Sequence, residues 1–213
     1  MQANAKLYDV IRIDHFIGIV NYWSIPSSCP TAVDGKWRKG PGKKLTDVIR
    51  EATKETDIIA EDLGVVGPNV RSLIRKTGWP GMKILEFAFD DSQENEYLPH
   101  NYPENSVVYT GTHDNETLMG FYGAKKKKDL KYVMDYLQIK KKKQIPSEMI
   151  RLGYSSIANT AIFQMQDVLG LDNRARMNLP SSVGTNWRWR MLPGAFTKEH
   201  CRYLKKLCKI YNR

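Results

Sequence analysis

The chain has 213 residues, of which 41% are hydrophobic and 10% aromatic, a composition typical of a globular protein with one sizeable core. No apolar run approaches the roughly 20 residues that a membrane-spanning helix needs, and the polar start Met1–Lys6 is unlike a signal peptide. Size and composition therefore predict a protein that has no membrane partner.

The formal net charge of +10 invites comparison with nucleic-acid-binding proteins. Most of the excess comes from residues 125–143, which contain nine Lys and two Asp. The apolar residues between the two lysine runs recur at helical spacing, which predicts a helix with solvated basic ends. No helix-turn-helix, zinc-finger or RNA-recognition motif accompanies them, so no nucleic-acid partner is expected, and a basic nucleic-acid module stays an alternative.

The three cysteines, Cys29, Cys201 and Cys208, are odd in number and lack the spacing of metal ligands. Cys201 and Cys208 lie seven residues apart on a predicted helix. This spacing corresponds to about 10.5 Å along the helix axis, too far for a disulfide. The cysteine pattern predicts a reducing compartment, the cytoplasm.

The first predicted strand covers residues 10–16 (VIRIDHF), with Val10 among its buried residues and polar residues at its carboxyl end. A long connection follows as far as residue 44 and is rich in aromatic residues, Pro and Gly. Connections of this length are typical of functional loops, and the large aromatic residues between Tyr22 and Trp37 argue against disorder.

Residues 45–56 are predicted as a helix because apolar residues recur every three to four positions. Residues 57–64 (DIIAEDLG) are predicted as the second strand, because their short apolar run leads into two acids, as expected for a parallel strand covered on both faces. The next helix is expected to begin at Pro68 and to end at Gly78.

Residues 82–87 and 107–110 are predicted as the next strands, separated by a polar loop over residues 90–105. Residues 187–190 (WRWR) are a plausible fifth strand. Helical patterns cover residues 117–122, 129–139, 147–152, 157–169 and 198–211.

The alternation of strands and helices predicts parallel pairing and an α/β architecture. Asp14, Glu61 and Asp114 each terminate a predicted strand that begins apolar, a pattern typical of the mouth of a (β/α)8 barrel. A single strand-end Asp is more often a cap of a loop or helix. Three acids at one barrel mouth repel each other, so their joint placement indicates a functional site.

Three carboxylates can bind Mg²⁺ or Ca²⁺, or they can act as nucleophile and acid in glycosyl chemistry. Glycosyl chemistry is favoured because neither a His/Cys cluster nor a phosphate-binding glycine loop accompanies them. Arg12 shares a strand face with Asp14, and its guanidinium favours the ionised carboxylate of a nucleophile. Glu61 follows an apolar run and suits a protonated acid, whereas Asp114 suits stabilisation of an oxocarbenium-like transition state.

Four motifs occur in the order RIDHF (12–16), AEDLG (60–64), GTHDN (111–115) and NWRWR (186–190). From about Tyr8 to the C-terminus they resemble the amylomaltase family, the 4-α-glucanotransferases or disproportionating enzymes of the α-amylase clan. The resemblance implies a retaining α-glucan transferase on a (β/α)8 barrel. It assigns the nucleophile to Asp14, the acid/base to Glu61 and the transition-state stabiliser to Asp114.

The same resemblance implies sugar-contacting or acid-orienting roles for Arg12, Asp62, His113 and Asn186. Trp187 and Trp189 are candidates for a glucan platform and equally for core residues. The implied partners are a maltooligosaccharide or other α-1,4-glucan donor and a glucose or maltooligosaccharide acceptor. The implied chemistry uses no cofactor and no metal.

The resemblance begins near the fourth strand of the family's barrel, and five candidate strands are present where closure needs eight. The expected fold is the C-terminal portion of a (β/α)8 TIM barrel, about strands four to eight. Residues 1–213 are then the C-terminal part of a glycosyl-transferring catalytic domain whose N-terminal half is missing. The alternatives are a truncated, non-catalytic fragment with weak glucan binding and an α-glucan hydrolase of the same clan.

Overall fold

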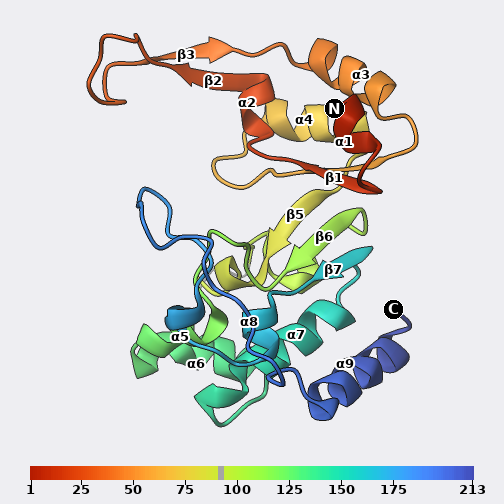
Figure 1. Cartoon of the computed structure of the whole chain (residues 1–213), viewed down its shortest axis with the longest axis vertical. Coiled ribbons are helices and arrows are strands. Elements are labelled where there is room, and N and C mark those ends of the chain that lie inside the picture. Colours follow the sequence, from red (N-terminus) through yellow and green to blue (C-terminus); the bar gives the residue numbers. More distant parts are fainter. Residues whose placement is uncertain (91–93) are drawn as a thin grey trace. The chain divides into compact units, whose positions relative to one another are not determined.

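The structure of the protein is a computed structural model that describes residues 1–90 and 94–213. The chain divides into two compact units, the N-terminal unit Met1–Met82 and the C-terminal unit Lys83–Arg213 (Figure 1). Of the predicted polar loop over residues 90–105, residues 91–93 lie outside the described part. Among the described residues, no helix combines the length and the apolar character needed to cross a membrane.

The N-terminal unit is built on a parallel pair of strands, β1 (Val10–Ile13) and β4 (Asp57–Ala60). Parallel pairing of these two segments was predicted and is confirmed. The last three residues of β4 are buried, as expected for a strand covered on both faces. The prediction of a buried Val10 is wrong: it pairs with the exposed Asp57 at the open start of the two strands and is half-exposed.

The helices of this unit are α1 (Gln2–Ala5), α2 (Ile17–Val20), α3 (Lys43–Ala52) and α4 (Pro68–Thr77). As predicted, α4 begins at Pro68 and ends before Gly78, whose φ of 71° suits a residue without a Cβ. The predicted helix over residues 45–56 ends sooner, at Ala52. Thr53 leaves helical geometry there while its hydroxyl donates to the carbonyl of Ile49.

The core of the N-terminal unit gathers apolar side chains from β1, β4 and the helices. Its members are Ile11, Phe16, Ile19, Ile49, Ile58, Ala60, Val70, Leu73 and Trp79. Phe16 is fully buried and meets Trp79 edge-on, with 6.1 Å between the ring centroids. Since Phe16 follows Asp14 by two positions, its burial anchors the loop that begins at the carboxyl end of β1.

The long connection after residue 16 contains an antiparallel ribbon, β2 (Asn21–Ser24) and β3 (Lys36–Lys39), which projects from the rest of this unit (Figure 1). Trp23 and Trp37 are paired across it, with 5.4 Å between their ring centroids. The segment after residue 16 was predicted as a long loop, and this part of it has regular structure instead. Cross-strand aromatic contacts stabilise a ribbon that local sequence alternation does not indicate.

A sheet in the order β5-β6-β7 consists of β5 (Gly81–Ile84), which spans the boundary between the units, and of β6 (Ser106–Tyr109) and β7 (Thr160–Ile162) of the C-terminal unit. β6 and β7 are parallel, with Val108 opposite Ala161. The prediction of a helix over residues 157–169 is wrong, because β7 and the short α8 (Met165–Val168) occupy this segment. Pairing of Ala161 with a buried strand outweighs the local helical pattern.

The predicted strand over residues 187–190 is also wrong, because the chain turns there. Trp187 has a φ of 65°, outside the range of a strand. The guanidinium of Arg190 donates to the carbonyls of Trp187 and Trp189, at 3.1 Å and 2.7 Å. These bonds fold the segment back on itself.

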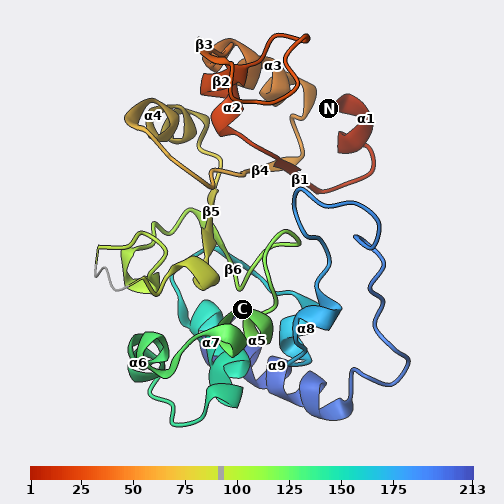
Figure 2. The same ribbon diagram turned by 90° about the vertical axis from the view of Figure 1, so that its left-hand side faces the viewer.

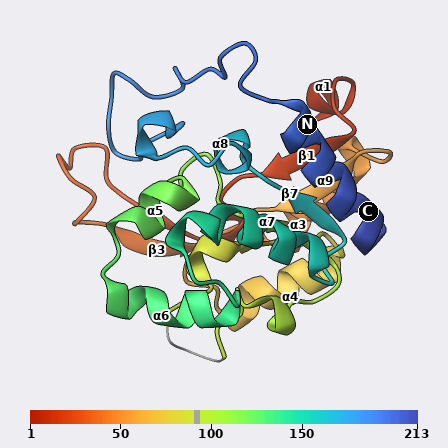
Figure 3. The ribbon, with the colours of Figure 1, turned by 90° about the horizontal axis from the view of Figure 1, so that it is seen from below.

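Helices α5, α6 and α7 gather on one side of the sheet (Figure 2). The longer helices are α5 (Leu118–Ala124), α6 (Lys127–Tyr136), α7 (Ile145–Ser155) and α9 (Lys198–Tyr211). Single 3₁₀ turns occur at Leu85–Phe87, Pro99–Asn101, Lys142–Gln144 and Asn173–Ala175. α9 has the predicted bounds and packs against α7 (Figure 3).

The lysine-flanked segment forms α6, whose apolar face belongs to the core of the C-terminal unit. Leu130, Val133 and Leu137 are buried there with residues of β6, α5 and α7. The flanking lysines Lys125–Lys128 are exposed. The prediction of an amphipathic helix with a solvated basic start is confirmed, but the helix ends at Tyr136, so the second lysine run, 140–143, lies beyond it and Lys142 is only half-exposed.

Candidate active site

The first candidate acid, Asp14, directly follows β1 at its carboxyl end. Its side chain is 77% exposed, and Arg12 Nη2 lies 3.2 Å from Asp14 Oδ1. The ion pair agrees with the strand alternation, which puts these two residues on one face. An exposed carboxylate that a guanidinium holds by one oxygen keeps the other oxygen available for chemistry.

Glu61, the second acid, follows the neighbouring strand β4 and is buried. Its Oε2 accepts the backbone N–H of His15 at 2.6 Å, and its Oε1 accepts the N–H of Leu63 at 2.8 Å. The Glu61 N–H donates to the carbonyl of Ile13, and its carbonyl accepts the N–H of Phe16, both at 2.9 Å. The Glu61 carboxyl is thereby fixed beside the backbone that immediately follows Asp14.

Asp62 is engaged with the start of β5 rather than exposed to solvent. Its Oδ1 accepts the N–H of Met82 at 2.7 Å. A Cβ at Gly81 would lie only 2.4 Å from Asp62 Oδ2, so glycine allows the backbone to approach the carboxylate.

The third acid, Asp114, lies in the C-terminal unit, in the loop after β6. His113 Nε2 is 3.4 Å from Asp114 Oδ2, and Asn178 Nδ2 donates to Oδ1 at 2.6 Å. Trp187 is 53% exposed, and its ring lies 4.9 Å from the His113 ring between centroids. Arg176 Nη2 donates to the Asp114 carbonyl at 2.7 Å. Together these contacts place an exposed carboxylate beside an imidazole that packs on the half-exposed Trp187.

Asn186 holds the loop of residues 179–186 together. Its Oδ1 accepts the N–H of Leu179 at 3.0 Å, and its Nδ2 donates to the carbonyl of Ser182 at the same distance. These bonds place Asn186 immediately before Trp187 and tie it to its own loop.

Sequence reasoning missed two buried acids of the C-terminal unit. Burial is the main cause that raises the pKa of Glu86 to about 8, and burial likewise raises the pKa of Asp167 to about 6. Asp167 is satisfied by the hydroxyl of Thr110 at 2.6 Å and the N–H of Leu118 at 2.7 Å. An acid inside an apolar run, as Glu86 is, was the available signal.

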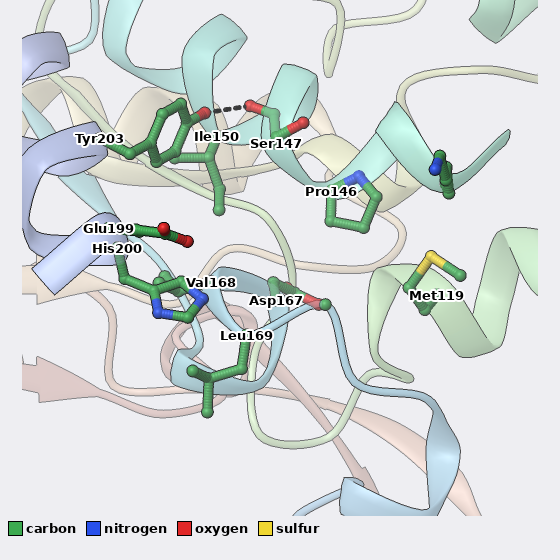
Figure 4. Close-up of a pocket in the computed structure, with 12 residues that line it drawn as sticks. Met119, Pro146, Ser147, Ile150, Asp167, Val168, Leu169, Glu199, His200 and Tyr203 are labelled. Carbon is green, nitrogen blue, oxygen red and sulfur yellow. Dashed lines mark hydrogen bonds between the residues drawn. The ribbon is translucent and has the colours of Figure 1, made fainter. Parts of the chain in front are cut away.

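A cavity of about 390 Å³ lies among α7, α8 and α9. Met119, Ile150, Asp167, Glu199, His200 and Tyr203 are among the residues that surround it (Figure 4). The hydroxyl of Tyr203 donates to the carbonyl of Ser147 at its edge. None of the residues predicted to act on sugar lines this cavity. Within residues 1–90 and 94–213, no group of three or more His, Cys, Asp or Glu is arranged to hold a metal ion.

The parallel pairing of β1 with β4 and of β6 with β7 defines an α/β protein, with Asp14 and Glu61 directly after β1 and β4 and Asp114 in the loop after β6. A sequence profile described as 4-alpha-glucanotransferase matches residues 1–195, and the chain belongs to the 4-alpha-glucanotransferase family. The resemblance drawn from the four motifs is thereby confirmed.

Relatives and a solved structure agree with this assignment. Proteins named 4-alpha-glucanotransferase from Thermus thermophilus and Clostridium butyricum are 45% and 44% identical over the whole chain. The chain spans 44% of the length of each. It matches 43% of amylomaltase from Streptococcus agalactiae, solved in complex with acarbose, with a TM-score of 0.93, 40% identity and full coverage of this chain.

A further match is to the fold of amylomaltase from Corynebacterium glutamicum, at 15% identity. It has a TM-score of 0.77 and covers 97% of this chain and 36% of that protein. The predicted α/β fold class is confirmed as part of an amylomaltase fold.

Proposed function

We propose that the protein transfers α-1,4-glucan segments to an acceptor sugar by a retaining double displacement. The observation that carries the proposal is the pairing of Asp14 and Glu61 at the carboxyl ends of adjacent parallel strands. The Glu61 carboxyl is held by the N–H of His15, the residue after Asp14. Retaining glycosyl transfer needs two carboxyl groups about 5 Å apart, one as nucleophile and one as acid/base.

In the proposed first step, Asp14 attacks the anomeric carbon of the donor while Glu61 protonates the departing glycosidic oxygen. The donor is an α-1,4-glucan such as a maltooligosaccharide, and a glycosyl ester of Asp14 forms. In the second step, Glu61 removes the proton from the 4-hydroxyl of a glucose or maltooligosaccharide acceptor, which attacks the ester. Both steps are acid/base and nucleophilic chemistry and need no cofactor.

Asp114 is proposed to stabilise the oxocarbenium-like transition state, with His113 as a donor to sugar hydroxyls. Arg12 is proposed to orient Asp14, and Asp62 and Asn186 to orient the loops that contact sugar. The exposure of Trp187 and its contact with His113 support a platform role for this residue. The exposed aromatic side chains of the β2–β3 ribbon are proposed to contact the acceptor.

The proposed context is the C-terminal part, about strands four to eight, of a (β/α)8 catalytic domain, with residues 1–213 as one segment of it. The three acids would then follow strands four, five and seven of the barrel. The strand predicted over residues 82–87, between Glu61 and Asp114, supports this numbering because β5 covers its first part, although residues 85–87 form a 3₁₀ turn instead of a strand. Free thiols at the three cysteines support a reducing compartment, and we propose the cytoplasm.

Incubation of maltotriose with the full-length protein tests the proposed activity. We expect a ladder of longer maltooligosaccharides together with glucose, separated by chromatography. Glucose and maltose alone would instead identify an α-glucan hydrolase, the second candidate activity.

The 213-residue chain alone tests whether the segment acts by itself. Loss of strand partners exposes sheet edges that favour association, so we expect an inactive segment with weak glucan binding. A monomer that melts cooperatively and produces the ladder would contradict this expectation.

Trp187→Ala is expected to raise the KM for maltotriose about fivefold, because one aromatic contact with a sugar ring is worth about 1 kcal/mol. Steady-state kinetics of the full-length protein measure the effect. Trp187→Phe retains an aromatic face and is the matched control, expected to restore most of the affinity. An unchanged KM in the alanine variant would assign Trp187 a packing role only.

A further inference from the structure

Glu86 is a buried carboxyl that the proposed reaction does not use. It lies in the 3₁₀ turn that follows β5, and 6% of its surface is exposed. Its Oε1 accepts from Asn115 Nδ2 at 3.3 Å, whereas its buried Oε2 has no hydrogen-bond partner among the described residues. Burial of an unpaired carboxyl oxygen disfavours the charged form, so Glu86 is a neutral acid at neutral pH.

The charged groups around Glu86 come from several segments and mostly act in the same direction. Burial is the main cause that raises the pKa of Glu86 to about 8, and the carboxylates of Glu116 and Asp167 also raise it. The bond from Asn115 and the guanidinium of Arg176 lower it. On α5, the phenol of Tyr122 also interacts with Glu86.

Asn115 and Arg176, which favour a charged Glu86, are both bonded to the loop that carries Asp114. Asn115 Oδ1 accepts the N–H and the hydroxyl of Thr112, each at 2.8 Å, and the Thr112 hydroxyl oxygen accepts the Asp114 N–H at 3.3 Å. Arg176 Nη2 donates to the Asp114 carbonyl at 2.7 Å. Two separate connections therefore join the surroundings of Glu86 to Asp114.

Gly111, two residues after β6, is closely surrounded by side chains. A Cβ at Gly111 would lie 3.0 Å from Gln164 Nε2, 3.1 Å from Asn115 Cβ and 3.5 Å from Glu86 Oε2. Glu86 and Asn115 thus both lie beside the same backbone position, just before the loop that carries Asp114.

We propose that Glu86 is a positioning residue whose neutral carboxyl holds the Asp114 loop in place through Asn115 and leaves Arg176 on the Asp114 carbonyl. Ionised Glu86 attracts the Arg176 guanidinium and the Asn115 amide, and both shifts displace the Asp114 backbone. The inference rests on the proposed function, in which Asp114 stabilises the transition state.

The pH profile of maltotriose disproportionation by the full-length protein tests this inference. Below pH 8 Glu86 is neutral and activity is retained, and above pH 8 it ionises and activity is lost. At pH 9 about one-tenth of the molecules carry the neutral acid, so we expect about a tenfold fall in kcat from this ionisation. Glu86→Gln keeps a neutral, equally large side chain, and its kcat should not show this fall.

Glu104→Gln is the matched control, since Glu104 is exposed in the same unit. This control should keep the alkaline fall of the unaltered protein. An alkaline fall of equal size in Glu86→Gln and in the unaltered protein would overturn the proposal.

A second measurement separates this inference from the proposed function. The side-chain amide of Asn115, observed by NMR after labelling with ¹⁵N-asparagine, should titrate near pH 8 in the unaltered protein and not in Glu86→Gln. Titration without any transferase activity would reject the proposed function and retain the coupling of Glu86 to Asn115. Transferase activity without this titration would reject the role of Glu86 alone.

Discussion

Asp14→Asn is expected to abolish the maltooligosaccharide ladder, with a fall in kcat of at least about 10³-fold. An amide nitrogen or oxygen at this position cannot form the glycosyl ester that the proposed mechanism requires. The substitution preserves size, and Asp14 is exposed, so the fold should be unaffected. Turnover of maltotriose by the purified full-length variant measures the effect, and a melting curve verifies that the variant is folded.

Glu61→Gln is the informative comparison for that experiment. It removes the proton donor but leaves Asp14, so a donor whose leaving group needs no protonation, such as α-maltosyl fluoride, should still form the ester. Release of fluoride by Glu61→Gln and not by Asp14→Asn would assign acid and nucleophile separately. Full transferase activity in Asp14→Asn, or fluoride release by both variants, would reject the role given to Asp14.

Phe16→Ala is expected to lower the free energy of unfolding of the N-terminal unit by about 3–5 kcal/mol. Phe16 is 0% exposed and packs edge-on against Trp79, so its removal loses a buried ring and leaves a cavity. Chemical denaturation of the protein, followed by tryptophan fluorescence, measures the loss. The variant should also lose activity, because the loop that joins Asp14 to Phe16 supplies the N–H that holds Glu61.

Phe87→Ala provides the same change of side chain at a partly exposed position, where Phe87 is 39% exposed. We expect a clearly smaller destabilisation there. Equal losses for the two variants would mean that Phe16 burial does not support the loop at the end of β1.

Strands and helices with strong local signals were predictable from the sequence. Pro68 and Gly78 bound α4 as expected, and α9 has the predicted ends. The wrong predictions concern segments in which distant contacts decide the structure. Residues 160–162 are a strand because they pair with β6, and the β2–β3 ribbon exists because Trp23 meets Trp37. Neither partner is visible within a local window of sequence.

The candidate site was predictable where an acid ended an apolar run, as at Asp14 and Glu61. The residues that contact Asp114 were harder to predict from the sequence. Arg176 and Asn178 lie some sixty residues further along the chain and reach Asp114 only through the fold. Glu86 was missed for a different reason: it lies inside the predicted strand 82–87, and its place in an apolar run hinted at a buried acid that the structure then showed.

The way in which the Glu61 carboxyl is held determines which substitutions its neighbours tolerate. The Glu61 carboxyl accepts hydrogen bonds from two main-chain amides, those of His15 and Leu63. Every amino acid except proline supplies such an amide. Proline is also unsuited to position 15, where φ is 48°. Substitution at position 63 therefore leaves the bond to Glu61 Oε1 in place, whereas position 15 also requires a residue that adopts a left-handed backbone, so the bond to Oε2 depends more on which residue stands there.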